Sequence, residues 1–358
     1  MIKVGIVGAS GWADVAHLPA LAALDEYRVT AVATTRQESA DRVAARYGVP
    51  LAFADAGALT AHDDVDLVVV SVRAALHTKV IRAALEAGKH VLSEWPLTVD
   101  PDEAAELAEA AATAGVTHAV CLQGYHSPGA RFVADLVAGG RIGRLESVVM
   151  VASGGPLGGA AVAPQHSWTT DPAGGTTLLT IMGGHFLATL ERMTGELAEV
   201  SARLPHLYDS VRVGGTGETV DGGVPNQVLL HGTLAGGATA SVTIHGAAGD
   251  PDGFYVKLVG SEGALTVTPG RGGDYLHWAE WDIRADGERV EVPRAYRTVS
   301  LDPADGPAAN VAAVYRDLAT AIGEGRAPNP GFHAAARYHR LLATIERAAR
   351  SGAREEIA

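Results

Sequence analysis

The segment VGIVGASGWADVAHLPAL, residues 4–21, decides the fold of the amino-terminal part of this chain. Its first residues form a β-branched run that predicts a strand, and Gly8 and Gly11 follow this strand directly before a helix-like stretch. At such a junction, missing side chains let backbone amides approach a diphosphate, whose charge the helix dipole favours. The spacing is G-x-x-G rather than the common G-x-G, so a plain tight turn is the alternative. The predicted diphosphate loop consists of Gly8, Ser10, Gly11, Trp12 and Ala13.

Strand-like runs alternate with helix-like stretches over residues 1–122, and this alternation predicts a Rossmann domain, an α/β fold with a doubly wound parallel sheet. A helix is expected from Leu76 to Ala87, where a left-handed cap at Gly88 ends it. The next helix is expected to begin with Asp100 as its N-cap and Glu103 closing a capping box. The expected strands are Lys3 to Val7, Val29 to Thr34, Leu67 to Val72, His90 to Ser93 and Val116 to Leu122.

Residues 123–358 have a different pattern, because most strand-like runs there are joined by glycine-rich turns or longer loops. This pattern predicts a second, α+β domain with a largely antiparallel open sheet, which we expect to cover the nicotinamide end of a dinucleotide. Helices are expected from Ser127-Pro128 to about Gly139, from Phe186 to Met193, and from Asn310 to Arg350 with a break near Pro328. The expected strands are 144–153, 197–204, 227–234, 238–246, 254–260 and 264–268.

Composition and charge argue against several classes of partner. Lysine and arginine total 28 against 41 acidic residues, a net charge of −13, and no basic cluster is visible, so nucleic acid is not an expected partner. No apolar stretch reaches about 18 residues, so we expect no membrane span and a cytoplasmic protein. The single cysteine, Cys121, excludes an intramolecular disulfide and is expected to be buried on a strand. The 14 histidines lack metal-ligand spacing, so no metal is expected.

The end of the second expected strand bears on the choice of cofactor. It reads Ala33-Thr34-Thr35-Arg36 and holds no carboxylate that would accept a hydrogen bond from a ribose 2′-hydroxyl. Arg36 can pair with a 2′-phosphate and stack on adenine, while Thr35 donates a hydrogen bond. NADP is therefore favoured; the alternative is NAD, with Arg36 in solvent.

These segments resemble the glucose-fructose oxidoreductase and inositol dehydrogenase family, Gfo/Idh/MocA. Besides residues 4–21, the matching text is DDVDLVVVSVRAALHTKVIRAALEAGKHVLSEWPLTVD at 63–100, IGRLESV at 142–148 and WTTDPAGGTTLLTIMGGH at 168–185. The resemblance implies an NAD(P)-dependent oxidoreductase that acts on a small molecule, usually a sugar derivative. It also implies a homodimer or homotetramer formed through the C-terminal sheet.

Two positions depart from the family pattern. The segment after the fourth long strand usually reads Glu-Lys-Pro, and its lysine assists proton transfer, but this chain has Glu94, Trp95 and Pro96 there. An indole cannot act as an acid or base near neutral pH. The second motif usually has an aspartate four residues before its histidine, and here Ile181 precedes His185.

These departures fit a subgroup that resembles the fungal galactose-pathway repressor. The shared features are the Gly-Trp-Ala after the first strand, the tryptophan in place of lysine, and Leu122-Gln123-Gly124 shortly before Ser127-Pro128. That repressor binds a dinucleotide while it controls a transcription activator, so the resemblance points to two kinds of function.

The resemblance also implies which side chains line the site. The implied cofactor contacts, beyond the loop and the end of the second strand, are Ser71, Val72, Arg73, His77, Glu94, Trp95 and Gln123. The implied substrate contacts are Trp95, Tyr125, His126, Trp168 and His185, with His185 and Tyr125 as the candidate catalytic groups. Structural roles are the alternatives: an ion pair for Arg73, capping or packing for His77, and packing for Tyr125 and His185.

Two functional hypotheses follow. In the first, the chain transfers hydride between nicotinamide and a carbonyl, imine or secondary alcohol of a sugar-like or cyclic substrate. In the second, the chain is a dinucleotide-binding regulatory protein without turnover, which the loss of the lysine and the aspartate favours. Measuring dinucleotide binding and turnover together distinguishes the two.

Overall fold

The computed structural model describes residues 1–358 except 156, 172–173, 247–252, 274, 303–305 and 358. The chain divides into two compact units, the first formed by residues 1–123 and 298–337 and the second by residues 124–297 and 338–358. The expectation of one contiguous second domain over residues 123–358 is therefore wrong. The chain returns to the first unit because helix α8 (Ala308–Glu324) buries its apolar face in that unit's core.

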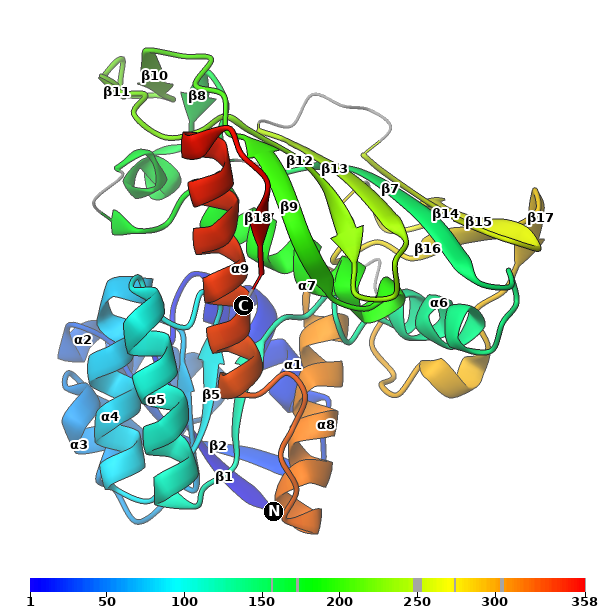
Figure 1. The fold of residues 1–358 in the computed structure, drawn as a ribbon. Helices are drawn as coiled ribbons and strands as arrows, with labels where there is room; N and C mark the ends of the chain where they lie inside the picture. Colours follow the sequence, from blue (N-terminus) through cyan, green and yellow to red (C-terminus); the bar gives the residue numbers. More distant parts are fainter. Residues whose placement is uncertain (156, 172–173, 247–252, 274, 303–305, 358) are drawn as a thin grey trace. The chain divides into compact units, whose positions relative to one another are not determined.

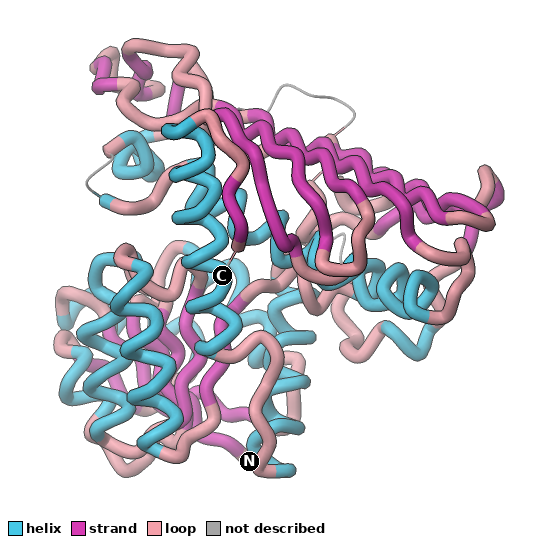
Figure 2. The backbone as a smooth tube through the Cα atoms, in the orientation of Figure 1, coloured by secondary structure: helices cyan, strands magenta, loops and turns pink. Residues whose placement is uncertain are grey.

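The first unit is built on a six-stranded sheet in the order β3-β2-β1-β4-β5-β6. Its neighbouring strands all pair in parallel, which is the doubly wound Rossmann arrangement. Strands of this sheet, in magenta, lie among helices drawn in cyan in Figure 2. The five expected strands are confirmed, whereas the three-residue β3 is too short to carry a periodic signal. The strands are β1 (Ile2–Val7), β2 (Tyr27–Ala33), β3 (Leu51–Phe53), β4 (Leu67–Val70), β5 (His90–Glu94) and β6 (His118–Cys121).

Helices cover both faces of this sheet. Helices α3, α4 and α5 lie side by side on one face, and α1 and α8 lie together on the other (Figure 1). Besides α8, the helices are α1 (Leu18–Ala22), α2 (Gln37–Tyr47), α3 (Ala56–Thr60), α4 (His77–Glu86) and α5 (Pro101–Ala114), with a π-helical turn η1 (Ala13–His17) and a 3₁₀ turn η2 (Ala74–Leu76). Asp100 caps α5 as expected, by accepting from the amide of Asp102 at 2.8 Å. The predicted capping-box role of Glu103 is corrected, because its carboxylate accepts instead from the Thr78 hydroxyl at 2.8 Å.

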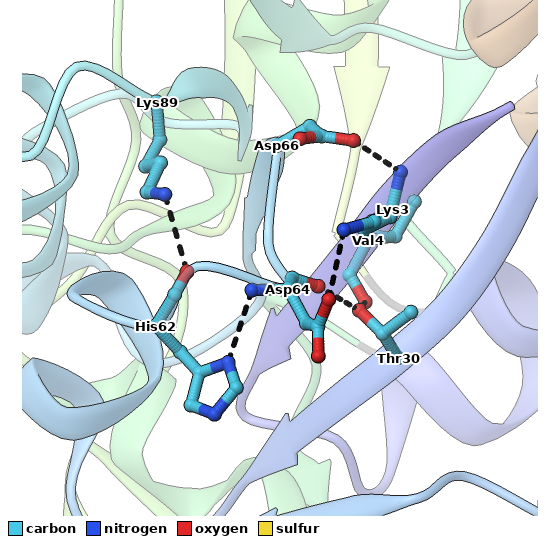
Figure 3. Close-up of polar contacts among 7 residues, drawn as sticks. All are labelled: Lys3, Val4, Thr30, His62, Asp64, Asp66 and Lys89. Atoms are coloured by element: carbon cyan, nitrogen blue, oxygen red, sulfur yellow. Dashed lines mark hydrogen bonds and ion pairs between the residues drawn. The ribbon is translucent and has the colours of Figure 1, made fainter.

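Polar contacts fix the amino-terminal ends of the strands (Figure 3). The Lys3 amide donates to the Asp66 carboxylate at 2.9 Å, and the Lys3 ammonium lies 2.8 Å from the Asp64 carboxylate. The Lys89 ammonium donates to the carbonyl oxygen of His62 at 3.1 Å, and the His62 Nδ1 accepts from the amide of Asp64 at 3.0 Å. Since ligands of open α/β sheets bind at the carboxyl ends of the strands, this end of the sheet has a structural role.

The second unit is built on a nine-stranded sheet in the order β17-β16-β15-β14-β7-β13-β12-β9-β18. Only β7 and β13 pair in parallel among the described neighbours of this sheet, so the largely antiparallel expectation is confirmed. Strands β16 to β18 were not predicted. The strands are β7 (Leu145–Ser153), β9 (Leu197–Arg203), β12 (Gln227–Leu234), β13 (Thr239–His245), β14 (Phe254–Gly260), β15 (Gly263–Pro269), β16 (Trp281–Ala285), β17 (Glu288–Val290) and β18 (Glu355–Glu356).

Helices and a small sheet complete the second unit. The unpredicted three-stranded sheet has the order β11-β10-β8, formed by Thr219–Asp221, Ser210–Val213 and Ala161–Val162. Helix α7 (Gly184–Thr194) confirms the expected helix and follows a π-helical turn, η5 (Leu178–Gly183). The remaining elements are α6 (Pro128–Ala138), the 3₁₀ turns η3 (Pro164–Thr170) and η6 (Arg294–Tyr296), and α9 (Phe332–Ser351), which begins after the predicted break. Across the residues that the structure describes, no helix combines the length and apolarity needed to cross a bilayer.

His118 fastens the start of α9 to strand β6 in the first unit. Its Nδ1 accepts from the amide of Phe332 at 3.1 Å, and the two rings lie 4.7 Å apart. Nearby, the amide of Val120 donates to the carbonyl oxygen of Pro330 at 3.1 Å. Burial, and then the neighbouring His333, lower the pKa of His118 to about 4.

We expect the free energy of unfolding to fall, between about pH 7.5 and pH 5, by about 2 kcal/mol more in the wild-type chain than in a His118→Gln variant. The unfolded chain takes up a proton on His118 below about pH 6.5, whereas folded His118 stays neutral down to a pKa of about 4. This contribution is therefore fully present above the unfolded-state pKa and is lost as the pH falls toward 4. Urea titrations at the two pH values measure the difference, and equal losses in the two proteins would contradict it.

Candidate functional site

The turn after β1 has the backbone geometry of a diphosphate loop. Gly8 and Gly11 have φ angles of +88° and +60°, which side chains rarely permit. A Cβ on Gly8 would lie 2.3 Å from the carbonyl oxygen of Ser71, whereas a Cβ on Gly11 would meet nothing within 4 Å. The amide of Gly8 donates to the carbonyl of Ala33 at 2.9 Å, so the turn is also tied to the end of β2. Gly8 is required by space as well as by conformation.

The parallel register brings several predicted cofactor residues to neighbouring strand ends. Val7 pairs with Val70 and Val70 with Ser93, so Gly8, Ser71 and Glu94 follow one another across the sheet. This is the point where the strand order reverses, the usual place of a dinucleotide in such sheets. The buried hydroxyl of Ser71 has no hydrogen-bond partner among the described residues.

Gln123 provides a second unpartnered group at the same edge of the sheet. Cys121, two residues earlier, pairs with Glu94 at the end of β6. Gln123 is buried, and no described residue donates to its Oε1. A ligand donor at this edge would satisfy it, so these residues fit a dinucleotide.

At the end of β2, Thr35 and Arg36 are exposed. The hydroxyl of Thr34 donates to the carbonyl of Arg36 at 2.9 Å, which fixes the backbone before α2. The guanidinium of Arg36 forms no hydrogen bond or ion pair with the described residues. It is available to an anionic group at the start of α2, as the sequence predicts for a 2′-phosphate.

His77 and Trp95 pack into the structure. His77 is buried, with its Nδ1 3.0 Å from the carbonyl oxygen of Pro96 and its Nε2 2.9 Å from that of Val72. This ring connects the turns after β4 and β5, so the packing role is the one observed and a cofactor contact stays a prediction. Trp95 is only 4% exposed. The Arg73 side chain is exposed beside Val72.

A buried network around Glu94 was not predicted. His17, at the end of η1, places Nε2 2.9 Å from the Glu94 Oε1 and Nδ1 2.8 Å from the Tyr315 hydroxyl. Cys121, buried as expected, also forms a hydrogen bond with Glu94; burial first, and then Glu94, raises the pKa of this thiol. His17 lies in the segment AHLPAL, which belongs to the stretch that resembles the family, so the sequence did single out this part of the chain. Nothing in the sequence near Tyr315 indicated its contact with His17.

The second unit brings His185 close to the segment that follows Gly124. His185 is buried on α7, and its ring meets the ring of His277 edge-on at 5.2 Å. Burial first, and then His185, lower the pKa of His277 well below its usual value. A Cβ on Gly124 would lie 2.6 Å from the Thr189 hydroxyl and 3.0 Å from the His277 Nδ1, so this turn packs directly against the histidine pair.

Tyr125 and His126 are adjacent in the same turn. Their rings lie 5.5 Å apart, and the guanidinium of Arg192 lies over the Tyr125 ring at 5.1 Å. Tyr125 is half-buried and His126 is buried. The second unit therefore gathers three of the predicted substrate residues, and His277 is a neighbour that the sequence did not reveal.

Trp168 is half-buried in η3, and its indole donates to the carbonyl of Gln165 at 2.8 Å. This local bond fixes the ring within its own turn, and a substrate contact stays a prediction. Over the described ranges, no three or more His, Cys, Asp or Glu side chains are arranged to hold a metal ion.

Two family models match successive parts of the chain. Residues 2–122 match the family model described as "Oxidoreductase family, NAD-binding Rossmann fold", Gfo/Idh/MocA. Residues 128–269 match the model described as "Gal80p, C-terminal domain".

Two relatives and one solved structure illustrate the similarity. The galactose/lactose metabolism regulatory protein GAL80 of Saccharomyces cerevisiae is 29% identical over 66% of this chain, and the match covers 58% of that protein. D-xylose 1-dehydrogenase (NADP(+)) 2 of Haloferax volcanii is 27% identical over 99% of each chain. The structure of levoglucosan dehydrogenase in complex with NADH has a TM-score of 0.84 at 20% identity, over 100% of this chain and 99% of that one, which shows a common fold.

A Gly8→Ala substitution should lower the free energy of unfolding by more than about 3 kcal/mol, because the added methyl group meets backbone in a conformation that alanine disfavours. Gly11→Ala is the matched control, since it adds only the conformational cost of about 1 kcal/mol. Urea denaturation measures both values. Equal losses in the two variants would show that the approach to Ser71 does not constrain Gly8.

Proposed function

The chain belongs to the Gfo/Idh/MocA oxidoreductase family and carries a C-terminal domain of the Gal80p type, and from this premise we propose that it is an NAD(P)-dependent oxidoreductase. The proposed reaction transfers hydride between nicotinamide C4 and a carbonyl, imine or secondary alcohol of a sugar-like or cyclic small molecule. The observation that carries the proposal is the loop at Gly8, which has no room for a side chain and approaches Ser71, whose hydroxyl has no hydrogen-bond partner in the described part of the chain.

The proposed roles follow from the chemistry of each group. The bound nicotinamide supplies or accepts the hydride. In the first unit, the loop amides that follow Ser10, those of Gly11, Trp12 and Ala13, hold the diphosphate. Glu94 accepts from the nicotinamide ribose, and Trp95 offers an apolar surface. In the second unit, His185 donates or accepts the substrate proton, because an imidazole titrates near neutral pH, and Tyr125 is the second candidate.

NADP is the proposed cofactor in preference to NAD. Arg36 follows β2 and has an exposed guanidinium that no described residue pairs with, and the preceding residue, Thr35, adds an exposed hydroxyl. No carboxylate stands there to repel a 2′-phosphate. The full-length relative from Haloferax volcanii is named for NADP(+), which is consistent with this preference.

A regulatory protein without turnover is the second candidate function. Trp95 fills the position of the family lysine and is buried, and Ile181 stands where the family aspartate would assist His185. These replacements remove two groups that handle protons while leaving the dinucleotide loop intact. The similarity to the yeast regulatory protein favours the same reading.

We further propose that the open face of the nine-stranded sheet binds a second copy of this chain, giving a homodimer or homotetramer. Val149 is 40% exposed there, beside a depression of about 440 Å³. The depression is lined mainly by short uncharged side chains such as Ser147 and Ser241, with the paired Glu199 and Arg354 also present. Light scattering measures the mass in solution, and a monomer would contradict the proposed oligomer.

We also propose a cytoplasmic location, and the free thiol of Cys121 is consistent with it.

The enzyme hypothesis predicts NADPH oxidation with at least one member of a panel of ketoses, cyclic ketones and imines. A His185→Ala variant should then lose turnover by about a hundredfold or more with unchanged cofactor affinity, because it loses only the proton-transfer group. His206→Ala, an exposed position in the same unit, is the control. Tight dinucleotide binding with no turnover across the panel would instead support the regulatory protein.

The cofactor hypothesis predicts that Arg36→Ala weakens NADP binding by about tenfold to a hundredfold and leaves NAD binding nearly unchanged, since the lost bonds are charge-assisted. Arg42→Ala is the matched control, because Arg42 lies on α2, the helix that follows Arg36, and its guanidinium is 2.7 Å from the Glu38 carboxylate. Fluorescence titration with both dinucleotides measures the effect. Equal weakening of NADP and NAD would exclude a 2′-phosphate contact.

A further inference from the structure

A buried chain of hydrogen bonds joins helix α8 to the end of strand β5. The Tyr315 hydroxyl lies 2.8 Å from the His17 Nδ1, and the His17 Nε2 lies 2.9 Å from the Glu94 Oε1. His17 and Tyr315 are fully buried, whereas the Glu94 side chain keeps 13% of its surface exposed. Of the three hydrogen-bonded residues, Glu94 is thus the one that a ligand can reach most readily.

One tautomer of His17 gives every donor in this network an acceptor. Burial first raises the pKa of Tyr315 well above its usual value, so its hydroxyl keeps its proton and can donate to the His17 Nδ1. A neutral imidazole that accepts at Nδ1 carries its proton on Nε2 and donates to the carboxylate. With His17 in this Nε2–H form, the hydrogen bonds run from the Tyr315 hydroxyl through His17 to the Glu94 carboxylate.

The local backbone explains how His17 reaches Glu94. Residues Ala13–His17 form a π-helical turn directly after the glycine loop, and such turns change which side chains face a given direction. The same short segment therefore carries both the loop amides and the ring that contacts Glu94.

A second contact holds Tyr315 in place from the other side. The Tyr27 hydroxyl donates to the backbone carbonyl of Tyr315 at 2.7 Å, and the two rings lie 5.3 Å apart. This contact supports helix α8 but is not one of the hydrogen bonds that join Tyr315, His17 and Glu94. Removal of the Tyr27 hydroxyl is thus a control, because it removes a buried hydroxyl and leaves those hydrogen bonds in place.

We propose that His17 and Tyr315 are positioning residues that orient the Glu94 carboxylate toward the nicotinamide ribose, which makes α8 part of the dinucleotide site. The inference rests on the proposed function, because it concerns how that site holds its cofactor. Glu94 lies at the end of β5, two strands from β1, on the side of the strand-order reversal away from β2 and Arg36. A carboxylate fixed by buried donors loses little rotational freedom when the ribose hydroxyls bind.

The test compares each dinucleotide with the fragment that lacks nicotinamide riboside: NADP with 2′,5′-ADP, and NAD with ADP. In Tyr315→Phe, the dinucleotide affinity should fall by about fivefold to tenfold while the fragment affinity stays constant. Tyr27→Phe should leave all four affinities unchanged. His17→Gln retains an amide donor for Glu94 and should bind dinucleotide more tightly than His17→Leu.

The outcomes separate this inference from the proposed function. If the wild-type chain binds neither dinucleotides nor fragments, the proposed function fails. If it binds them and Tyr315→Phe changes dinucleotide and fragment affinities equally or not at all, the positioning role fails while the function stands. Imidazole ¹⁵N spectra of the ligand-free chain give an independent readout: the inference requires the Nε2–H form of His17, and an Nδ1–H form would overturn it.

Discussion

The close approach between Gly8 and the carbonyl oxygen of Ser71 is the constraint on which the first unit depends. Neighbouring parallel strands place Val7 opposite Val70, so the turns that follow β1 and β4 meet at one edge of the sheet. A Cβ at Gly8 would lie 2.3 Å from that oxygen, and any side chain would force the two strand ends apart. The packing of the two strand ends and the conformation of the loop therefore depend on the same missing side chain.

Helix α8 couples the core of the first unit to its ligand-binding edge. Its apolar side packs with η1 and α1, while the Tyr315 hydroxyl contacts His17 and, through it, Glu94. Such a network specifies one arrangement of its members, because a buried polar group left without a partner costs free energy. The same helix thus stabilises the fold and orients the carboxylate.

The groups proposed to bind a dinucleotide are present in this chain, whereas two groups that transfer protons in the family are replaced. The first unit retains the loop, the free guanidinium of Arg36 and the orientable Glu94, whereas Trp95 and Ile181 replace groups that move protons elsewhere in the family. His185 is the proposed proton-transfer group; its ring meets that of His277, and Ile181 stands four residues before it. Whether turnover survives depends on the protonation of this pair, since an acid–base group must exchange its proton near the working pH.

Local patterns in the sequence were enough to determine the Rossmann domain, its five longer strands and the glycine turn after β1, because period-two runs, glycine spacing and helix caps act over a few residues. They also identified the long strands of the second sheet and the break before α9. Tertiary structure alone decided that residues 298–337 rejoin the first unit, that Glu103 contacts Thr78, and that His17, Glu94 and Tyr315 meet. These contacts join residues far apart in the chain, and their free energy depends on burial and on which partners the packing brings together, which no local pattern encodes.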